Sequence, residues 1–253
     1  MGKSSSKVKT TETSFDIMDV LFEQGGQTVE ELETKLGLTN STVHRHLTTL
    51  QGRGYVVKDG SSYRLGFKLL TMGGQLRRNV TAYPMIKAKV DSLAAKTNER
   101  VQFIIKEQDE RVYLYTQTGE SAVQTGAYTG RRGPIHSSAA GKAIIANLPK
   151  TERDRLIDSL DLSKTGPNTI TDRGELRNAL REVRERGYSL NLEESTAGVH
   201  AVGAAVRGKN GEVVGALSIS GPATRLKGDR LEQELPDAVL GATNELELHI
   251  EHA

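Results

Sequence analysis

Hydroxyl, imidazole and guanidinium side chains recur along residues 39–50, at positions that a helix would place on one outer face. Val43, Leu47 and Leu50 fall at helical spacing and are expected to face inward. The polar set left on the opposite side comprises Ser41, Thr42, His44, Arg45 and Thr48. Short hydroxyls allow close approach, and an arginine can donate paired hydrogen bonds to guanine or bind a phosphate. This chemistry is suited to the major groove of double-stranded DNA.

A basic hairpin is predicted directly after this helix. Residues 55–58 and 62–65 alternate as strands do, and they flank Asp59-Gly60, a sequence typical of a tight turn. Lys58 and Arg64 lie on these strands and could hold phosphates. At the start of the preceding helix, Thr39 or Asn40 is expected to act as the N-cap.

Two further helices are predicted upstream. Residues 28–36 carry one apolar side and are followed by Gly37, a typical C-cap. A first helix is expected to begin at Ser14, with Phe15, Met18 and Phe22 spaced for the core. Helix, turn, helix and hairpin in this order predict a winged helix-turn-helix over residues 14–65, preceded by a flexible arm over residues 1–13. A small helical domain with a solvated polar helix is the alternative.

Charge is concentrated in the same part of the chain. The 253 residues carry a formal net charge of only +2, but residues 40–78 contain seven basic residues and one acidic residue. A local excess of this kind is the electrostatic footprint expected of phosphate binding. A solvated basic face would give the same pattern.

Several classes of protein are disfavoured by what the sequence lacks. There is no cysteine for disulfides or cysteine-bound zinc, no apolar run near the ~20 residues of a membrane span, and no signal-peptide pattern in residues 1–13. We therefore expect a cytoplasmic protein without membrane contact. The six histidines form no metal-ligand pattern, and Gly141-Lys142 does not satisfy a phosphate-binding loop. We expect no enzyme activity, no metal and no cofactor, with Lys142 as a solvated helix residue.

A helix over residues 66–78 is expected to follow the winged domain. Its apolar residues, Phe67, Leu69, Leu70, Met72 and Leu76, occupy more of the circumference than one domain surface requires. We interpret residues 66–80 as a linker helix that also packs on a second subunit. A helix that caps its own domain is the alternative.

The remainder of the chain predicts an α+β domain. Helices are expected over residues 85–95, 138–148, 151–160, 173–186 and 230–252, the last broken or restarted near Pro236, and strands over 101–105, 111–115, 199–206 and 213–220.

Three segments in this second part make the chain resemble the IclR family of transcriptional regulators. They are residues 135–146 (IHSSAAGKAIIA), residues 186–194 with Gly198-Val199 (RGYSLNLEE…GV), and residues 215–222 (GALSISGP). The resemblance implies a GAF-like effector-binding and oligomerisation domain over residues 81–253, dimers or tetramers, and repression or activation controlled by a small molecule. Residues 168–172 and 225–230 are similar to archaeal members.

A candidate effector site follows from the residues and from the resemblance together. A Gly- and Arg-rich loop containing Gly133 leads into a helix start built from Ser138, Ala139 and Ala140, whose uncovered first-turn amides would favour an anion. Close helix–sheet packing is the alternative reason for these small residues. Ser218 and Ser220 share one face of a strand, although an edge-facing polar stripe would look the same. The resemblance adds Asn191 and Ala201, while Glu193 and Glu194 are expected to organise the loop.

These observations predict a ligand-responsive, DNA-binding regulator of a metabolic operon. Its partners would be a near-palindromic operator, a small organic or sugar acid, and further copies of itself, as a dimer or a tetramer. The alternative is a small-molecule sensor module whose winged domain mediates only protein–protein contacts.

Overall fold

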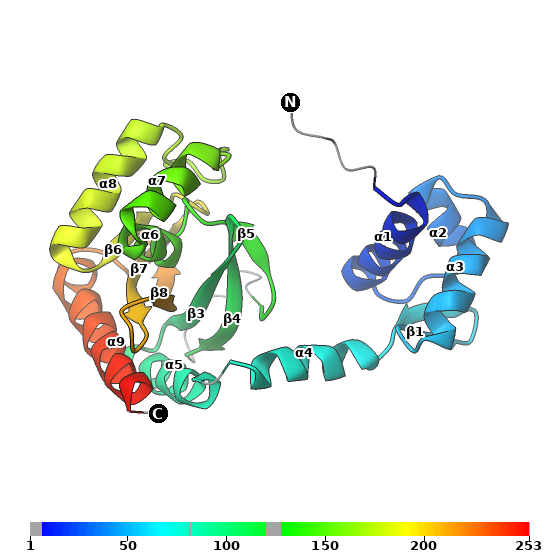
Figure 1. Cartoon of the computed structure of the whole chain (residues 1–253), viewed down its shortest axis with the longest axis horizontal. Helices are drawn as coiled ribbons and strands as arrows, with labels where there is room; N and C mark the ends of the chain where they lie inside the picture. The colour runs from blue at the N-terminus through cyan, green and yellow to red at the C-terminus, as the bar shows by residue number, and fades with distance from the viewer. Residues whose placement is uncertain (1–6, 81, 120–127, 253) are drawn as a thin grey trace. The chain divides into compact units, whose positions relative to one another are not determined.

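A computed structural model describes residues 7–80, 82–119 and 128–252 of the chain (Figure 1). The chain divides into two compact units, residues 1–80 and 81–253.

The first unit is the predicted winged helix-turn-helix. Its elements are α1 (Lys9–Gln24), α2 (Val29–Leu36), α3 (Asn40–Gly52), β1 (Val56–Asp59), β2 (Ser62–Leu65) and α4 (Lys68–Arg78). Thr28 and Glu31 form a reciprocal capping box at the start of α2, and Gly37 ends that helix in a left-handed conformation. Val43, Leu47 and Leu50 are buried as the helical spacing predicts. They pack with residues of α1, α2 and the hairpin into one small core.

The prediction for α1 was wrong in two respects. The helix begins at Lys9 rather than at Ser14, so residues 9–13 belong to α1 and not to a flexible arm; residues 1–6 lie outside the described residues. Thr13 and Ser14 each donate a hydroxyl hydrogen bond to the carbonyl four residues earlier, which is compatible with a helix.

The apolar face of α1 also differs from the prediction. Ile17 and Leu21 form the buried stripe, and Met18 packs against the same core as predicted, whereas Phe15 and Phe22 remain 59% and 58% exposed. Helix α1 therefore has two apolar stripes, and only one of them enters the core of this unit.

Two local details of the winged unit also depart from the prediction. Asp59 pairs with Ser62, so the hairpin loop is Gly60-Ser61 rather than Asp59-Gly60, with Gly60 at a positive φ of 61°. Thr39 occupies the N-cap position of α3, but its side chain makes no capping bond to the backbone. Its hydroxyl instead lies 3.0 Å from that of Thr42.

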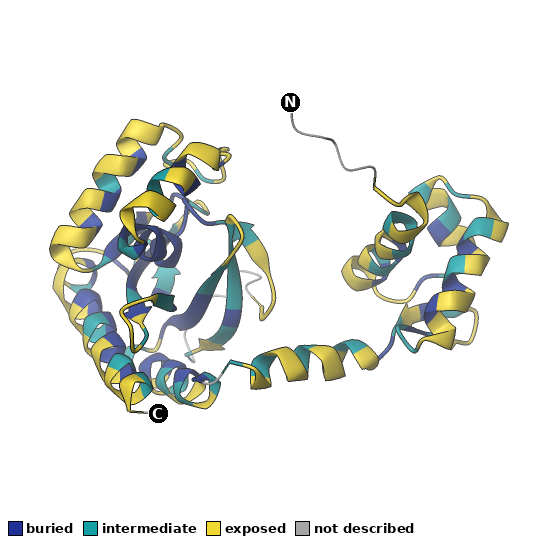
Figure 2. Ribbon diagram, viewed as in Figure 1, coloured by how far each residue is buried: buried dark blue, intermediate teal, exposed yellow. Residues whose placement is uncertain are grey.

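Helix α4 is the predicted helix after the hairpin, and it has no buried residue (Figure 2). The adjoining Phe67 is 77% exposed, and Leu70 and Leu76 of α4 are 64% and 70% exposed. An apolar surface of this kind is unusual for a helix that merely covers its own unit.

The second unit has the predicted α+β fold, with two short strands that the sequence did not reveal. Its elements are α5 (Tyr83–Thr97), β3 (Arg100–Glu107), β4 (Glu110–Thr118), β5 (Arg132–Pro134), α6 (Ala139–Asn147), α7 (Lys150–Ser159), α8 (Arg173–Arg186), β6 (Ser189–Leu192), β7 (Val199–Arg207), β8 (Val213–Pro222), the π-helical turn η1 (Arg230–Glu234) and α9 (Leu235–Glu251). The predicted break near Pro236 corresponds to the change from η1 to α9. The unpredicted strands β5 and β6 are three and four residues long, too short for a clear alternation.

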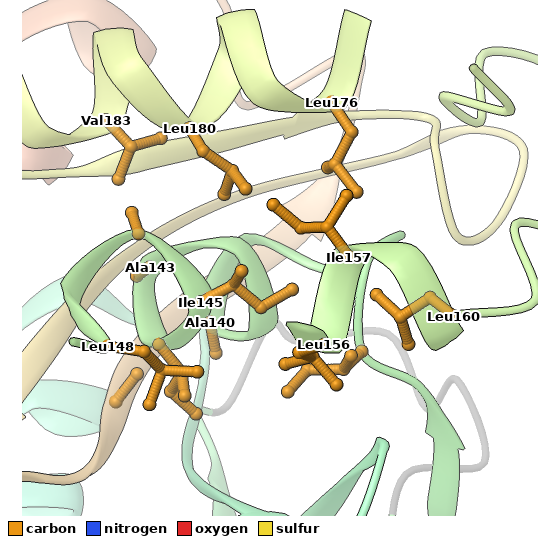
Figure 3. Packing of buried hydrophobic residues seen from close by; sticks show 14 of the residues in the cluster. Ala140, Ala143, Ile145, Leu148, Leu156, Ile157, Leu160, Leu176, Leu180 and Val183 are labelled. Atoms are coloured by element: carbon orange, nitrogen blue, oxygen red, sulfur yellow. The ribbon is translucent and has the colours of Figure 1, made fainter. Parts of the chain in front are cut away.

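One antiparallel sheet with the strand order β5-β4-β3-β8-β7-β6 organises this unit. Helices α5 and α9 lie along one face of the sheet, and α6 packs against the other (Figure 1). Helices α7 and α8 cover α6, and their aliphatic side chains meet those of α6 in a continuous core (Figure 3). Residues 139–146 are all buried, so α6 is a central helix.

The prediction for Lys142 was wrong for this reason. Lys142 lies on α6, is only 4% exposed, and forms an ion pair with Glu194, which is also buried, in the turn after β6. Burial raises the pKa of the Glu194 carboxyl and lowers the pKa of the Lys142 ammonium, while their mutual attraction opposes both shifts. The pair fixes the turn after β6 against α6.

Further hydrogen bonds hold the same turn. The hydroxyls of Thr165 and Thr169 both donate to the carbonyl of Glu194, and the Glu193 carboxylate accepts from the amide of Gly198. Glu193 and Glu194 thus organise this loop, as predicted.

We predict that Lys142→Met lowers the free energy of unfolding by about 3–5 kcal/mol, because Glu194 would be left buried without its cation. Adding Glu194→Leu should restore much of this loss, since neither charge then remains. Urea unfolding of the whole chain, followed by circular dichroism, measures both. Lys87→Met, which breaks the exposed pair with Asp91, is the control and should have a much smaller effect. Equal losses for the two single variants would contradict the role of the buried pair.

Candidate functional site

The outer face of α3 presents the residues predicted to read DNA bases. Ser41, His44, Arg45 and Thr48 are exposed, and Thr42 is half-buried. The Thr48 hydroxyl donates to the carbonyl of His44 at 2.8 Å. Within the described part of the chain, the Arg45 guanidinium has no hydrogen-bond or ion-pair partner, so its donors remain available to a ligand.

The hairpin carries the two cations predicted to hold phosphates, and both are exposed. The Lys58 ammonium lies 5.6 Å from the centre of the Tyr63 ring. Arg64 lies at the same distance from the Phe67 ring and forms a loose 3.7 Å ion pair with Asp59. Because these contacts are at the surface, the side chains can exchange them for phosphate oxygens at little cost.

A second candidate site is a cavity of about 370 Å³ in the second unit, which we call the sheet cavity. All six strands of the large sheet contribute to its wall. Seven of the eight residues predicted for an effector line it: Gly133, Ser138, Ala139, Asn191, Ala201, Ser218 and Ser220.

The strand register explains why residues so distant in sequence meet here. Asn191 on β6 pairs with Ala201 on β7, which pairs with Ser220 on β8, so the three form one row across the sheet. Ser218, two residues before Ser220, pairs with Gln102 on β3. The Gln102 amide donates to the Ser220 hydroxyl at 2.8 Å and links the two strands inside the cavity.

Ala140 does not reach the sheet cavity. It is fully buried in the core around α6, and Gly203 of β7 packs so closely that an added Cβ would lie 2.7 Å from the Ala140 amide nitrogen. The Ser138 hydroxyl accepts from the amide of Gly141 at 3.0 Å. The helix start is therefore not uncovered as predicted, because its own cap and the sheet already occupy part of it.

The side-chain amide of Asn191 already makes several hydrogen bonds within the protein. Its Nδ2 donates to the carbonyl of Ser137 at 2.7 Å and to the hydroxyl of Ser195 at 3.1 Å, and its Oδ1 accepts from the amide of Glu194 at 3.0 Å. Both N–H groups are used, which leaves one lone pair on Oδ1 for a ligand. The main effect of Asn191 is to hold the loops that close this end of the cavity.

Sequence reasoning missed several residues that line the sheet cavity, above all Arg111, Tyr113 and Gln102. Arg111 and Tyr113 are two residues apart on β4 and share a face. Gln102 was detectable as the polar residue within an apolar strand segment, but its orientation could not be known without the neighbouring strands.

The cavity wall is electrostatically one-sided. Among the described residues that line it are three arginines, Arg111, Arg131 and Arg132, and no aspartate or glutamate. Such a wall favours an anion. Across residues 7–80, 82–119 and 128–252, no cluster of histidine and acidic side chains could hold a metal ion. In the same residues, no helix is both long and apolar enough to cross a membrane.

Comparison with known proteins agrees with this two-part construction. The family model of the IclR helix-turn-helix domain matches residues 11–60, and that of the bacterial transcriptional regulator IclR C-terminal domain matches residues 78–247. The "Probable HTH-type transcriptional regulator ArcR" of the archaeon Halobacterium salinarum is 32% identical over 251 residues, covering 98% of this chain and 95% of that protein.

Solved structures show the same fold. The crystal structure of the Thermotoga maritima IclR is similar with a TM-score of 0.84 and 27% identity, over 96% of this chain and 99% of that one. An IclR homolog from Microbacterium hydrocarbonoxydans, solved as a complex with 4-hydroxybenzoate, has a TM-score of 0.79 at 21% identity, over 96% and 98% of the two chains. With both of its units matched in order, the chain belongs to the IclR family of transcriptional regulators.

Proposed function

We propose that the protein regulates a metabolic operon by binding a near-palindromic DNA operator and a small organic acid. In this proposal residues 9–65 bind DNA, residues 66–80 link the two units, and residues 81–253 bind the effector and oligomerise. The observation that carries the effector half is the wall of the sheet cavity, which has no acidic residue among its described members and contains Arg111, whose buried Nε and Nη1 have no hydrogen-bond partner in the described residues.

The winged unit would place α3 in the major groove and the hairpin along the backbone. Arg45, whose guanidinium has no partner among the described residues, is suited to a base edge, and Thr42 lies one turn nearer the helix start. Lys58 and Arg64 would contact phosphates. A winged unit that binds only proteins would not need seven basic residues against one acidic residue in residues 40–78.

We predict that Arg45→Ala weakens binding to operator DNA about tenfold to a hundredfold and changes binding to random DNA little, because a base contact is lost. Lys58→Ala is the matched control for loss of charge. It should weaken binding to operator and to random DNA alike, and should reduce the slope of log K against log salt concentration by about one. Gel shifts with DNA from upstream of the protein's own gene and with random DNA of equal length measure the difference. Equal losses on both DNAs for Arg45→Ala would refute the assignment, and no shift at low salt would refute DNA binding itself.

The effector would occupy the sheet cavity between the strands and the loop before α6. Ser218 and Ser220 offer hydroxyls on one face of β8, while Ala201 and Gly133 line the cavity without polar side chains and so affect its shape. The 4-hydroxybenzoate complex of the Microbacterium hydrocarbonoxydans homolog shows a small organic acid bound by that protein. Binding can alter DNA affinity only if the effector prefers one arrangement of units or subunits over another.

A thermal-shift screen of organic and sugar acids should identify acids that raise the melting temperature of the wild type. Replacing both cavity serines, Ser218→Val with Ser220→Val, should weaken the binding of each such acid and reduce the shift that it causes. The substitution removes two hydroxyls, and the added methyl groups intrude on the cavity. Ile219→Val, on the opposite face of the same strand, is the matched control and should leave the ligand-induced shift in melting temperature intact. An unchanged shift in the double variant would place the effector elsewhere.

The working unit is proposed to be at least a dimer, with α4 in its interface. Support comes from the exposed Phe67, Leu70 and Leu76, together with the unburied stripe of Phe15 and Phe22 on α1. A second copy of this chain would cover such surfaces symmetrically and give the spacing that a palindromic operator requires.

Light scattering at micromolar concentration should therefore give a mass of at least twice 27.5 kDa. Leu70→Glu with Leu76→Glu should lower that mass, because two carboxylates would have to be buried in the interface. Thr71→Glu, on the same helix, is the control and should leave it unchanged. A monomeric wild-type protein would contradict the dimer, and an unchanged mass in the double variant would exclude α4 from the interface.

A further inference from the structure

Arg111 is the most unusual residue in the wall of the sheet cavity. Its Nε and Nη1 atoms are buried and have no hydrogen-bond partner in the part of the chain that the structure describes. The guanidinium lies 5.3 Å from the centre of the Tyr113 ring, a contact that orients it without using its hydrogen-bond donors. A buried donor without an acceptor costs free energy, and a ligand that accepts from it recovers that cost.

Gly133 makes this position of Arg111 possible. The two residues pair across β4 and β5, and a Cβ at residue 133 would lie 2.7 Å from Nη1 and 3.0 Å from Cζ of Arg111. The guanidinium therefore lies directly against the backbone of residue 133. Gly133 has no positive φ, so its lack of a side chain serves this close approach and not a turn.

The neighbouring Arg132 provides a contrast. It lines the same cavity but forms ion pairs with Glu107 and, at 2.6 Å, with Glu110. Its charge is thus already balanced, whereas no aspartate or glutamate of the described residues pairs with Arg111. Of these two arginines, Arg111 is the one whose charge is available to an anion.

The groups that line the cavity beyond Arg111, on β3, β8 and the loop before α6, are neutral and hydrogen-bonding. Ser220 accepts from Gln102 and keeps its own hydroxyl proton, Ser218 lies beside them, and the buried Ser137 hydroxyl has no partner among the described residues. An unsubstituted aromatic ring here would leave these groups unpaired, which is costly, while ligand hydroxyls would satisfy them.

We propose that Arg111 binds the carboxylate of the effector and that the effector is a hydroxylated carboxylic acid, with its hydroxyls toward Gln102, Ser218 and Ser220. This inference rests on the proposed function and specifies the orientation of the ligand within the same cavity. The acid group lies at the β4–β5 end, and not at the start of α6, where Ser138 already caps Gly141.

Isothermal titration of the whole protein with gluconate, threonate and glycerate tests the proposal. At least one of these hydroxy acids should bind, and sorbitol, which matches gluconate but has no carboxylate, should not. Arg111→Gln should weaken that binding about tenfold to a hundredfold, as expected for loss of a charged hydrogen-bonding pair. Arg132→Gln is the matched control and should change it by less than about threefold, because the exposed Arg132 is already paired.

Gly133→Ala is a second variant that leaves the arginine in the chain. Its added Cβ would displace the guanidinium, so binding should weaken in the same direction while Arg111 and the net charge are retained. Weaker binding in this variant would show that the position of the Arg111 guanidinium matters, independently of any effect of Arg111→Gln on folding. Circular dichroism monitors the folding of both variants.

The proposal is overturned if none of the three hydroxy acids binds, if sorbitol binds as tightly as gluconate, or if 4-hydroxybenzoate binds more tightly than all three. It is also overturned if the bound acid has equal affinity for the wild type and a folded Arg111→Gln or Gly133→Ala variant. Gel shifts with the same acid test the proposed function separately. An acid that depends on Arg111 but leaves DNA binding unchanged would refute regulation and keep the ligand site.

Discussion

The buried ion pair between Lys142 and Glu194 is the constraint on which the sheet cavity depends. It joins the central helix α6 to the turn after β6. Asn191 at the end of β6 donates one hydrogen bond to the loop before α6 and makes two more within that turn. Because both charges are buried, neither can be lost alone without a large cost in stability. The polar wall of the cavity is thereby held open by interactions within the protein, and its remaining unpaired donors are left for a ligand.

A similar separation of roles is found in the winged unit. Ile17 and Leu21 of α1 join the core, while Phe15 and Phe22 of the same helix, and the apolar residues of α4, stay at the surface. The unit therefore does not use all of its apolar surface to fold. On α3 the division is between the buried Val43 and Leu47 and the exposed Arg45, so the polar face that we propose to contact DNA lies outside the core.

In the two candidate sites, cationic groups meet different surroundings. On α3 and the hairpin they are exposed, which suits a phosphate backbone in water and makes binding sensitive to salt. In the sheet cavity the Arg111 guanidinium is partly desolvated, so each hydrogen bond to an anion is stronger and more selective in geometry. The first arrangement suits a long polyanion, and the second suits one small acid.

The sequence by itself determined the winged helix-turn-helix, the α+β class of the second unit and most of its longer elements, because helical and strand periodicities are local properties. It also identified seven of the residues that line the sheet cavity, partly through resemblance to a family. Only the tertiary structure decided which stripe of α1 is buried, that Lys142 is paired in the core, and that Ala140 is excluded from the cavity. Those outcomes, like the meeting of Arg111 with Gly133, depend on strand register and on packing between segments far apart in the chain, which no local pattern of residues encodes.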